Sequence, residues 1–205
     1  INFSKVNFME RKIKITESKD FTIGVVQDVT DEMIEKLQIR RERDIDPLTR
    51  LLNRRAFESY MNQLLIKNPI KTSALVMFDL DNLKLINDTF GHKWGDFYIK
   101  EAVQRLNGIA KRHQMLLSRR SGDEFTLLLY GFNNKQEIID CMDKFYAYLN
   151  ESLLRFPTGE ISKISISGGL TWIEKWPMDY ETILHRADEA LYISKFNNKG
   201  SWTQE

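Results

Sequence analysis

Cysteine, proline and long apolar runs are scarce in this sequence. Its 205 residues include one cysteine, Cys141, and four prolines. A single cysteine excludes a disulfide framework or a cysteine-rich metal cluster within the chain, and it fits a reducing compartment. No apolar run approaches the roughly 18 residues that a transmembrane helix needs, and no signal peptide is visible. We therefore expect a cytoplasmic domain with no membrane segment in this stretch.

An excess of one charge is also missing. The sequence has 30 Lys and Arg against 29 Asp and Glu, a formal net charge of +1. Such a chain has no global field for attracting nucleic acid, so we expect no nucleic-acid partner, and any anion site must be local. The apolar content of 42% is enough for one full domain and a small appendage. Because the chain starts at Ile1 rather than Met, we expect a fragment of a longer protein that can be tethered to a membrane.

Hydrophobic periodicity predicts helices interleaved with strands and one hairpin, which is typical of an α+β or α/β layered domain. The strands are expected over 72–81, 115–117, 125–130 and 161–173, and the helices over 48–67, 97–113, 134–154 and 180–196. Residues 87–96 contain Asn, Asp and two glycines, so they read as a loop.

The N-terminal part reads differently from the rest. Residues 21–32 predict a strand that runs into a helix cap at Thr30 or Asp31. Dense mixed charge with spaced apolar residues follows, so 31–45 is expected to be a linker helix. Residues 1–30 weakly resemble the closing strands of a PAS-type sensor; an ordinary β-hairpin tail is the alternative. The compact domain is expected to occupy 46–205.

Four acids occupy places where ligands usually bind. Asp79 and Asp81 end a strand with apolar residues on both faces, and Asp123 and Glu124 form the tip of the hairpin. If they converge, their carboxylates repel unless a cation lies between them, and a hard divalent ion such as magnesium suits oxygen ligands.

Nearby cations extend this interpretation. Lys84, Arg119 and Arg120 could complement phosphates, so the residues suggest metal-assisted chemistry on a nucleotide or another phosphate compound. The alternative is that the acids are solvated turn residues and that His92 is an ordinary surface histidine.

The motifs then match a known family. SGDEF at 121–125 resembles the signature of the GGDEF domain, and DPLTRLLNRRAF at 46–57 resembles the family's opening motif. FDLDNLKLINDTFGHKWGD at 78–96, ISISGGLT at 164–171 and RADEALYISKFNNKG at 186–200 resemble its other motifs, in the same order. The resemblance covers roughly residue 44 to the C-terminus.

The resemblance implies a fold and an activity. The fold would be a central, mostly antiparallel sheet wrapped by helices, like those of nucleotide cyclases and polymerase palm domains. Most members are diguanylate cyclases, which condense two GTP molecules into cyclic di-GMP and release two pyrophosphates. Each subunit binds one GTP, so a homodimer would be required, with Mg²⁺ or Mn²⁺ as the cofactor.

The resemblance also assigns roles to individual positions. Asp79 and Asp123, with the Leu80 carbonyl, would bind the metal, and Glu124 would lie beside it. Asp123 and Glu124 both remain candidates for accepting the hydroxyl proton. The positions expected to contact substrate are Lys84, Asn87, His92, Asp96, Ser121, Gly122, Lys195 and Lys199. Among these, the lysines would hold phosphates, and Asn87 and Asp96 would bind the guanine edge, because an acidic acceptor discriminates against adenine.

The sequence departs from the family pattern at several positions. Ser121 replaces the first glycine of the signature, adding a side chain and losing free use of positive φ. Leu83 replaces phenylalanine, Arg50 replaces glycine, and Asn198-Lys199 replaces Gly-Arg. The window for the family's inhibitory R-x-x-D motif reads RHQM at 112–115, so we expect weak or absent product inhibition there.

Two main hypotheses therefore stand at this point. The chain is a homodimeric, metal-dependent diguanylate cyclase, or it is a degenerate GGDEF module that binds GTP or cyclic di-GMP and regulates a partner without catalysis. The change at Ser121 favours the second hypothesis, and the intact acids and lysine favour the first. A variant that makes a mixed cyclic dinucleotide is a third idea, against which Asp96 speaks.

Overall fold

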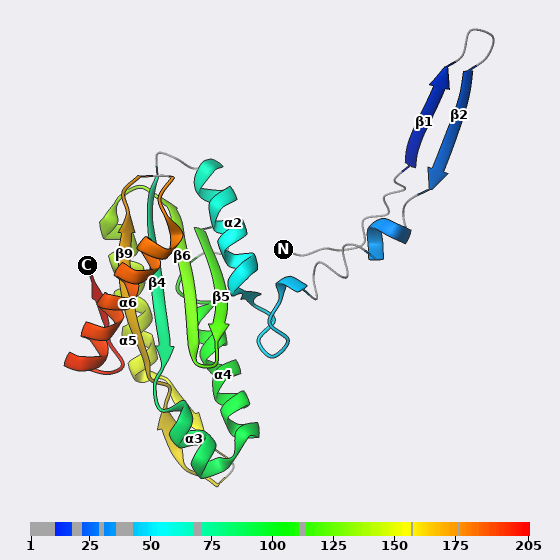
Figure 1. Ribbon diagram of the computed structural model, residues 1–205. Helices are drawn as coiled ribbons and strands as arrows, with labels where there is room; N and C mark the ends of the chain where they lie inside the picture. The colour runs from blue at the N-terminus through cyan, green and yellow to red at the C-terminus, as the bar shows by residue number, and fades with distance from the viewer. Residues whose placement is uncertain are drawn as a thin grey trace. The chain divides into compact units, whose positions relative to one another are not determined.

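The computed structural model describes residues 11–17, 22–28, 31–35, 43–67, 71–110, 114–156, 158–175 and 177–205 (Figure 1). The chain divides into two compact units, residues 1–44 and 45–205. In the first, β1 (Arg11–Glu17) and β2 (Thr22–Asp28) pair antiparallel, and residues 31–35 are helical. The strand predicted within 21–32 is confirmed. The PAS likeness and the full length of the linker helix stay predictions.

The second unit is built on a six-stranded mixed sheet with the order β10-β9-β4-β6-β5-β3. The strands are β3 (Leu52–Asn53), β4 (Thr72–Leu80), β5 (Met115–Ser121), β6 (Glu124–Phe132), β9 (Ile166–Ile173) and β10 (Trp202–Gln204). The three inner pairings are antiparallel, and the two edge pairings are parallel. The α+β architecture with a mostly antiparallel central sheet is therefore confirmed.

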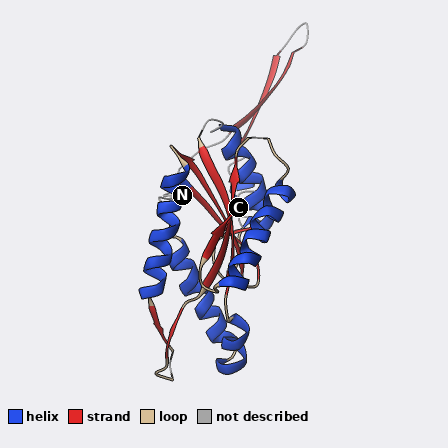
Figure 2. Cartoon of the chain, turned by 90° about the vertical axis from the view of Figure 1, so that its left-hand side faces the viewer, coloured by secondary structure: helices blue, strands red, loops and turns tan. Residues whose placement is uncertain are grey.

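Helices cover both faces of this sheet (Figure 2). One core cluster joins α2 (Arg54–Lys67) and α6 (Tyr180–Asn197) to alternate residues of β4 such as Leu75 and Met77. The other cluster joins α3 (Leu83–Phe90), α4 (His92–Leu106) and α5 (Lys135–Glu151) to Phe78 and Phe125. Both faces of β4 are therefore buried, as its continuous apolar run predicts.

Close backbone approach fixes α6 on the sheet. A Cβ at Gly169 of β9 would lie only 2.1 Å from the Leu191 nitrogen and 2.2 Å from the Ala187 oxygen. Only glycine permits this approach. The end of α6 is thereby set over the end of β4, where Asp79 lies.

Several predicted boundaries were wrong. Residues 87–96 form the end of α3 and the start of α4, joined at Gly91, whose φ of 85° makes a one-residue joint between the helices. The Asn, Asp and Gly content had suggested a longer loop. The predicted strand 161–173 is two strands, β8 (Ile161–Lys163) and β9, and β8 pairs with β7 (Leu153–Arg155). The helix predicted from Leu48 begins only at Arg54.

The first turn of the second unit is tied to the signature hairpin. The Asp46 carboxylate accepts hydrogen bonds from the Thr49 backbone N–H at 2.8 Å and hydroxyl at 2.6 Å. The Arg119 guanidinium reaches the same carboxylate at 3.2 Å and donates to the Gly122 carbonyl at 2.8 Å and 3.0 Å. Arg50, where the family has glycine, has a φ of 61°, a strained value for a non-glycine residue.

Asp81 is the structural hub of the second unit. Its carboxylate is only 4% exposed and accepts hydrogen bonds from the Ser165 hydroxyl at 2.8 Å and the Ser167 hydroxyl at 2.9 Å. The Asp81 backbone carbonyl accepts a hydrogen bond from the Tyr98 hydroxyl at 3.3 Å. The Tyr98 hydroxyl in turn accepts a hydrogen bond from the Ser165 backbone N–H. The interpretation of Asp81 as a metal-facing acid is therefore wrong, because this carboxylate is buried and satisfied by hydroxyls.

Replacement of Asp81 should destabilise the second unit. Asp81→Ala leaves the buried Ser167 hydroxyl and the partly buried Ser165 hydroxyl without their acceptor, and we expect a loss of about 3 kcal/mol in the free energy of unfolding. All four tryptophans lie beyond residue 45, so urea unfolding followed by tryptophan fluorescence reports this unit. Asp88→Ala, at an exposed position of α3, is the control and should change the value by less than about 0.5 kcal/mol. An equal loss of unfolding free energy in the two variants would contradict the structural role of Asp81.

Asp46 should contribute a pH-dependent part of the stability. Burial raises the pKa of this carboxyl, but hydrogen bonds from Thr49 and the Arg119 charge outweigh it and hold the pKa below 3.8. The stabilisation is therefore complete above the unfolded pKa and is lost as the pH falls through the folded pKa. Asp46→Asn should cost about 1 kcal/mol at pH 7, and its difference from wild type should shrink below pH 3.8. A difference that stays constant in paired urea titrations down to pH 3 would contradict this assignment.

Candidate functional site

Strand register brings the predicted acids to one edge of the sheet. Asp79 on β4 lies directly opposite Glu124 on β6, so their side chains share a face. At the hairpin tip, the Asp123 carbonyl accepts a hydrogen bond from the Leu80 N–H at 2.9 Å. Asp79, Asp123 and Glu124 therefore converge, while Asp81 turns into the interior.

Asp79 is a charged group in a partly buried place. Burial raises its pKa, and the nearby Asp123 and Asp81 carboxylates add to the rise. The Lys195 ammonium, 2.7 Å away, opposes these effects. A cation beside Asp79 is therefore electrostatically favoured, and α6 supplies one from its last turn.

The donor set suits a hard divalent ion that keeps other ligands. In the ranges that the structure describes, no three His, Cys, Asp or Glu side chains form a group that could hold a metal by themselves. Magnesium is commonly bound by one or two carboxylates together with substrate phosphates. Asp79 and Asp123, with the Leu80 carbonyl, fit that mode, because the structure brings these three residues together.

Glu124 is held by its neighbours on the hairpin. The Ser121 hydroxyl donates to its carboxylate at 2.8 Å, and the Arg120 Nε lies 3.8 Å from the same oxygen. In the described part of the chain, the non-glycine residues with positive φ are Arg50 and Asn82, so Ser121 adopts an ordinary backbone conformation. The expected conflict between a serine here and the glycine-type backbone does not arise.

Asn87 and Asp96 come from two helices that touch. A Cβ on Gly95 would lie 1.9 Å from the Asn87 side-chain oxygen, so that amide rests directly on α4 beside Asp96. His92 is the exposed first residue of α4. The helix pair thus carries an amide at Asn87 and an exposed carboxylate at Asp96, two group types suited to the edge of a base.

The predicted phosphate-binding lysines lie in different surroundings. Lys84 is exposed on the first turn of α3, and Lys199 is exposed in the turn after α6. Lys195 is half-buried through its ion pair. Gly122, at the hairpin tip, has a φ of 29° and open space around it.

The window that corresponds to the family's inhibitory R-x-x-D motif is only partly described by the structure. Arg112 and His113 lie outside the described residues, while Met115 starts β5 and is buried in the core. The position at which the family's aspartate would stand is thus filled by a packed apolar side chain.

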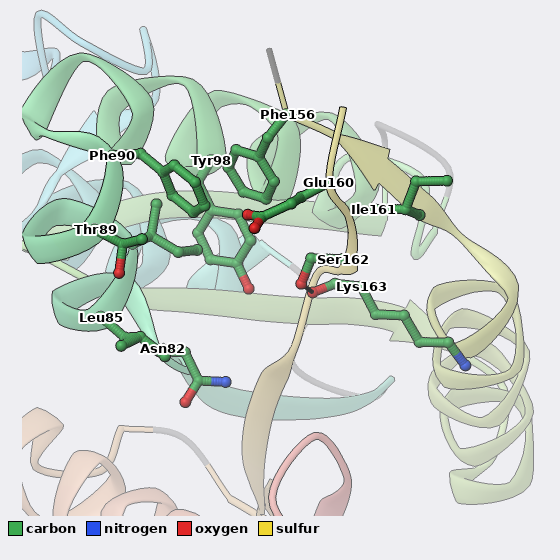
Figure 3. Close-up of a pocket in the computed structure, with 11 residues that line it drawn as sticks. Asn82, Leu85, Thr89, Phe90, Tyr98, Phe156, Glu160, Ile161, Ser162 and Lys163 are labelled. Carbon is green, nitrogen blue, oxygen red and sulfur yellow. Dashed lines mark hydrogen bonds between the residues drawn. The ribbon is translucent and has the colours of Figure 1, made fainter. Parts of the chain in front are cut away.

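A separate cavity of about 430 Å³ lies between α3 and the β7–β8 hairpin (Figure 3). Its walls include Leu85, Thr89 and Phe90 from α3 and Phe156 and Glu160 from the hairpin. The predicted substrate and metal positions do not line it. α3 therefore has two distinct sides, one carrying Lys84 and Asn87 and one facing this cavity.

Sequence reasoning missed several residues that shape the site. Gly95 was visible only as part of a motif, although its missing side chain is what admits Asn87. Ser165 and Ser167 were likewise visible only as part of a motif, and their pairing with Asp81 could not be inferred from it. Arg120 was considered for phosphates, but its position beside Glu124 depends on strand register.

Comparison with known proteins places this geometry in a family. Residues 43–201 match the GGDEF domain of diguanylate cyclases. Diguanylate cyclase DosC of Escherichia coli strain K12 is 28% identical over 196 residues, which span 95% of this chain and 42% of DosC. Probable diguanylate cyclase DgcE of the same strain is 30% identical over 190 residues, 89% of this chain and 16% of DgcE. The chain thus spans less than half the length of these relatives.

Solved structures agree with the sequence match. The coiled coil and GGDEF domain of DgcB from Caulobacter crescentus, crystallised with c-di-GMP, superposes with a TM-score of 0.75 at 26% identity, covering 85% of this chain and 93% of that one. The GGDEF domain of PA1120 from Pseudomonas aeruginosa gives a TM-score of 0.69 at 28% identity, covering 78% and 93%. From residue 43 to residue 201, the chain belongs to the GGDEF domain family of diguanylate cyclases.

Proposed function

We propose that this domain is an active diguanylate cyclase that condenses two GTP into cyclic di-GMP and two pyrophosphates across a homodimer. The observation that carries the proposal is the register pairing of Asp79 with Glu124, with Asp123 bonded to the end of β4. This pairing supports a site in which Asp79, paired with Lys195, lies at the same end of the sheet as Asp123 and Glu124, an arrangement suited to a metal-assisted reaction of a triphosphate.

The residues divide the work of the reaction. Asp79, Asp123 and the Leu80 carbonyl would hold Mg²⁺ or Mn²⁺, which when bound stabilises negative charge on the phosphate oxygens. Lys84, Lys195 and Lys199 would bind phosphates. In each half-reaction a 3′-oxygen forms a bond to the α-phosphorus of the other GTP, and the bond to pyrophosphate breaks. The hydroxyl proton passes to a carboxylate, for which Asp123 and Glu124 are the two candidates.

Base selection is assigned to the pair of helices that carries Asn87 and Asp96. A carboxylate can accept hydrogen bonds from guanine N1 and N2, whereas adenine would leave it unpaired. The contact of Asn87 with Gly95 supports this assignment, because it holds the amide against the helix that carries Asp96. This geometry favours GTP over ATP and speaks against a mixed cyclic dinucleotide.

The alternative is a binding module without catalysis, and Ser121 is the observation in its favour. Its hydroxyl engages Glu124 at 2.8 Å, which could hold a candidate proton acceptor away from the substrate. Against this, Ser121 has ordinary backbone geometry and an exposed side chain. Product formation by the native chain and by Ser121→Gly distinguishes the active cyclase from the binding module.

Assembly and location follow from the proposed reaction. Because each domain holds one GTP, two domains must face each other, and the use of GTP implies a cytoplasmic active site. No helix in the described ranges is long and apolar enough to cross a membrane. One relative, 26% identical over 153 residues, is an uncharacterized membrane protein of Staphylococcus aureus. A membrane-tethered full-length protein remains part of the proposal.

Incubation with GTP and Mg²⁺ at high protein concentration, with products separated by chromatography, tests the proposed function. The native chain and Ser121→Gly should form cyclic di-GMP, and Asp123→Ala should lose about a hundredfold or more in rate. Product from Ser121→Gly alone would favour the binding module. No product from either, even when dimerisation is forced by a fused coiled coil, would overturn the cyclase.

Gly95→Ala should weaken GTP binding with little effect on folding. The new Cβ meets the Asn87 side-chain oxygen at 1.9 Å, so the amide must rotate away from its place beside Asp96. Loss of about one hydrogen bond predicts a roughly tenfold rise in KM with a smaller change in kcat. Lys100→Ala, exposed on the same helix, is the control. An unchanged KM in Gly95→Ala would remove Asn87 from the base site.

A further inference from the structure

The ion pair between Lys195 and Asp79 joins two groups with separate roles in catalysis. The Lys195 Nζ lies 2.7 Å from the Asp79 Oδ2, and the two side chains are 35% and 16% exposed. This inference rests on the proposed function, in which Asp79 binds the metal and Lys195 binds phosphate. Neither group can do so fully while they bind each other.

The surroundings favour a cation beside Asp79 at all times. Asp123 lies at the neighbouring hairpin tip, and Asp81 is two residues away along the chain. A partly buried carboxylate near others is costly unless a positive charge neutralises it. In the free protein the Lys195 ammonium is that charge.

Lys195 is also placed to move while its backbone stays fixed. The preceding residue, Ser194, is buried and its hydroxyl donates to the Ser201 carbonyl at 2.7 Å, which anchors the last turn of α6. The long side chain of Lys195 is one-third exposed, so its ammonium can exchange Asp79 for a phosphate without movement of the helix.

We propose that Lys195 is a resident counter-ion that keeps divalent cations off Asp79 until nucleotide phosphates draw its ammonium away. The metal then takes the place of the lysine at the carboxylate, and the lysine pairs with phosphate. Metal and nucleotide binding are thereby coupled, and the free domain binds divalent ions weakly. By linkage, each ligand raises the affinity for the other.

The size of the effect follows from the charge removed. Loss of one positive charge in contact with Asp79 should tighten binding of a divalent ion to the nucleotide-free protein about tenfold, after allowance for solvent screening at a one-third exposed lysine. Lys84 is the matched comparison, because it is an exposed lysine of the same proposed site, whereas among the described residues the ion-pair partner of Asp79 is Lys195.

The test measures Mn²⁺ binding to the nucleotide-free chain from the electron paramagnetic resonance signal of free Mn²⁺. Lys195→Met should bind Mn²⁺ about tenfold more tightly than wild type, and Lys195→Arg should remain as weak as wild type. Lys84→Met should change the affinity less than about twofold. Adding Asp79→Asn to Lys195→Met should abolish the gain. Tryptophan fluorescence melts confirm that each variant is folded.

Two results would overturn the inference. The first is that Lys195→Met binds Mn²⁺ no more tightly than wild type. The second is that Lys84→Met gains as much Mn²⁺ affinity as Lys195→Met, which would mean that any positive charge near the site weakens metal binding. Because no turnover is needed, the test is independent of catalysis. A chain that makes no cyclic di-GMP but shows the expected affinities would contradict the proposed function and support the role of Lys195. A chain that makes cyclic di-GMP but shows the same Mn²⁺ affinity in wild type and Lys195→Met would support the proposed function and contradict the role of Lys195.

Discussion

The buried carboxylate of Asp81 is the constraint on which the site depends. It joins the end of β4 to Ser165 and Ser167 at the start of β9, and its carbonyl is bonded to Tyr98 of α4. The next residue, Asn82, takes a φ of 65°, and α3 begins immediately afterwards. The sharp change from strand to helix therefore happens beside a buried carboxyl group that two serine hydroxyls bind. As a result, Asp79 belongs to strand β4, whereas Lys84 and Asn87 belong to helix α3, which follows the end of that strand.

The hairpin is fixed by a second polar connection from a distant part of the sequence. Arg119 bridges the Asp46 carboxylate and the Gly122 carbonyl, so the first turn of the domain and the signature tip share one guanidinium. Any displacement of the chain at Asp46 would act on the loop that carries Asp123. The hydrogen bonds of Arg119 thus hold the hairpin that carries Asp123 and Glu124, and those of Asp81 hold the end of the strand that carries Asp79.

Much of the fold could be predicted from the sequence, because continuous apolar runs and alternating patterns report burial directly. The strand at β4, the hairpin and the helix at α6 belong to this class. The joint at Gly91 could not, because a single backbone dihedral decides whether Asn, Asp and Gly form a loop or two abutting helices. Asp79 and Asp81 look alike in sequence. Only the packing of two serines against one of them separates a site acid from a structural one.

The one-residue joint between α3 and α4 has a consequence for how substrate preference can change. The spacing between Asn87 and Asp96 is set by the crossing of two helices, and that crossing rests on Gly91 and on the close contact at Gly95. Under the proposed function, the gap offered to a nucleobase is therefore set by the backbone. Under the proposed function, a change in base preference would therefore involve the position of a helix as well as the side chain at Asp96.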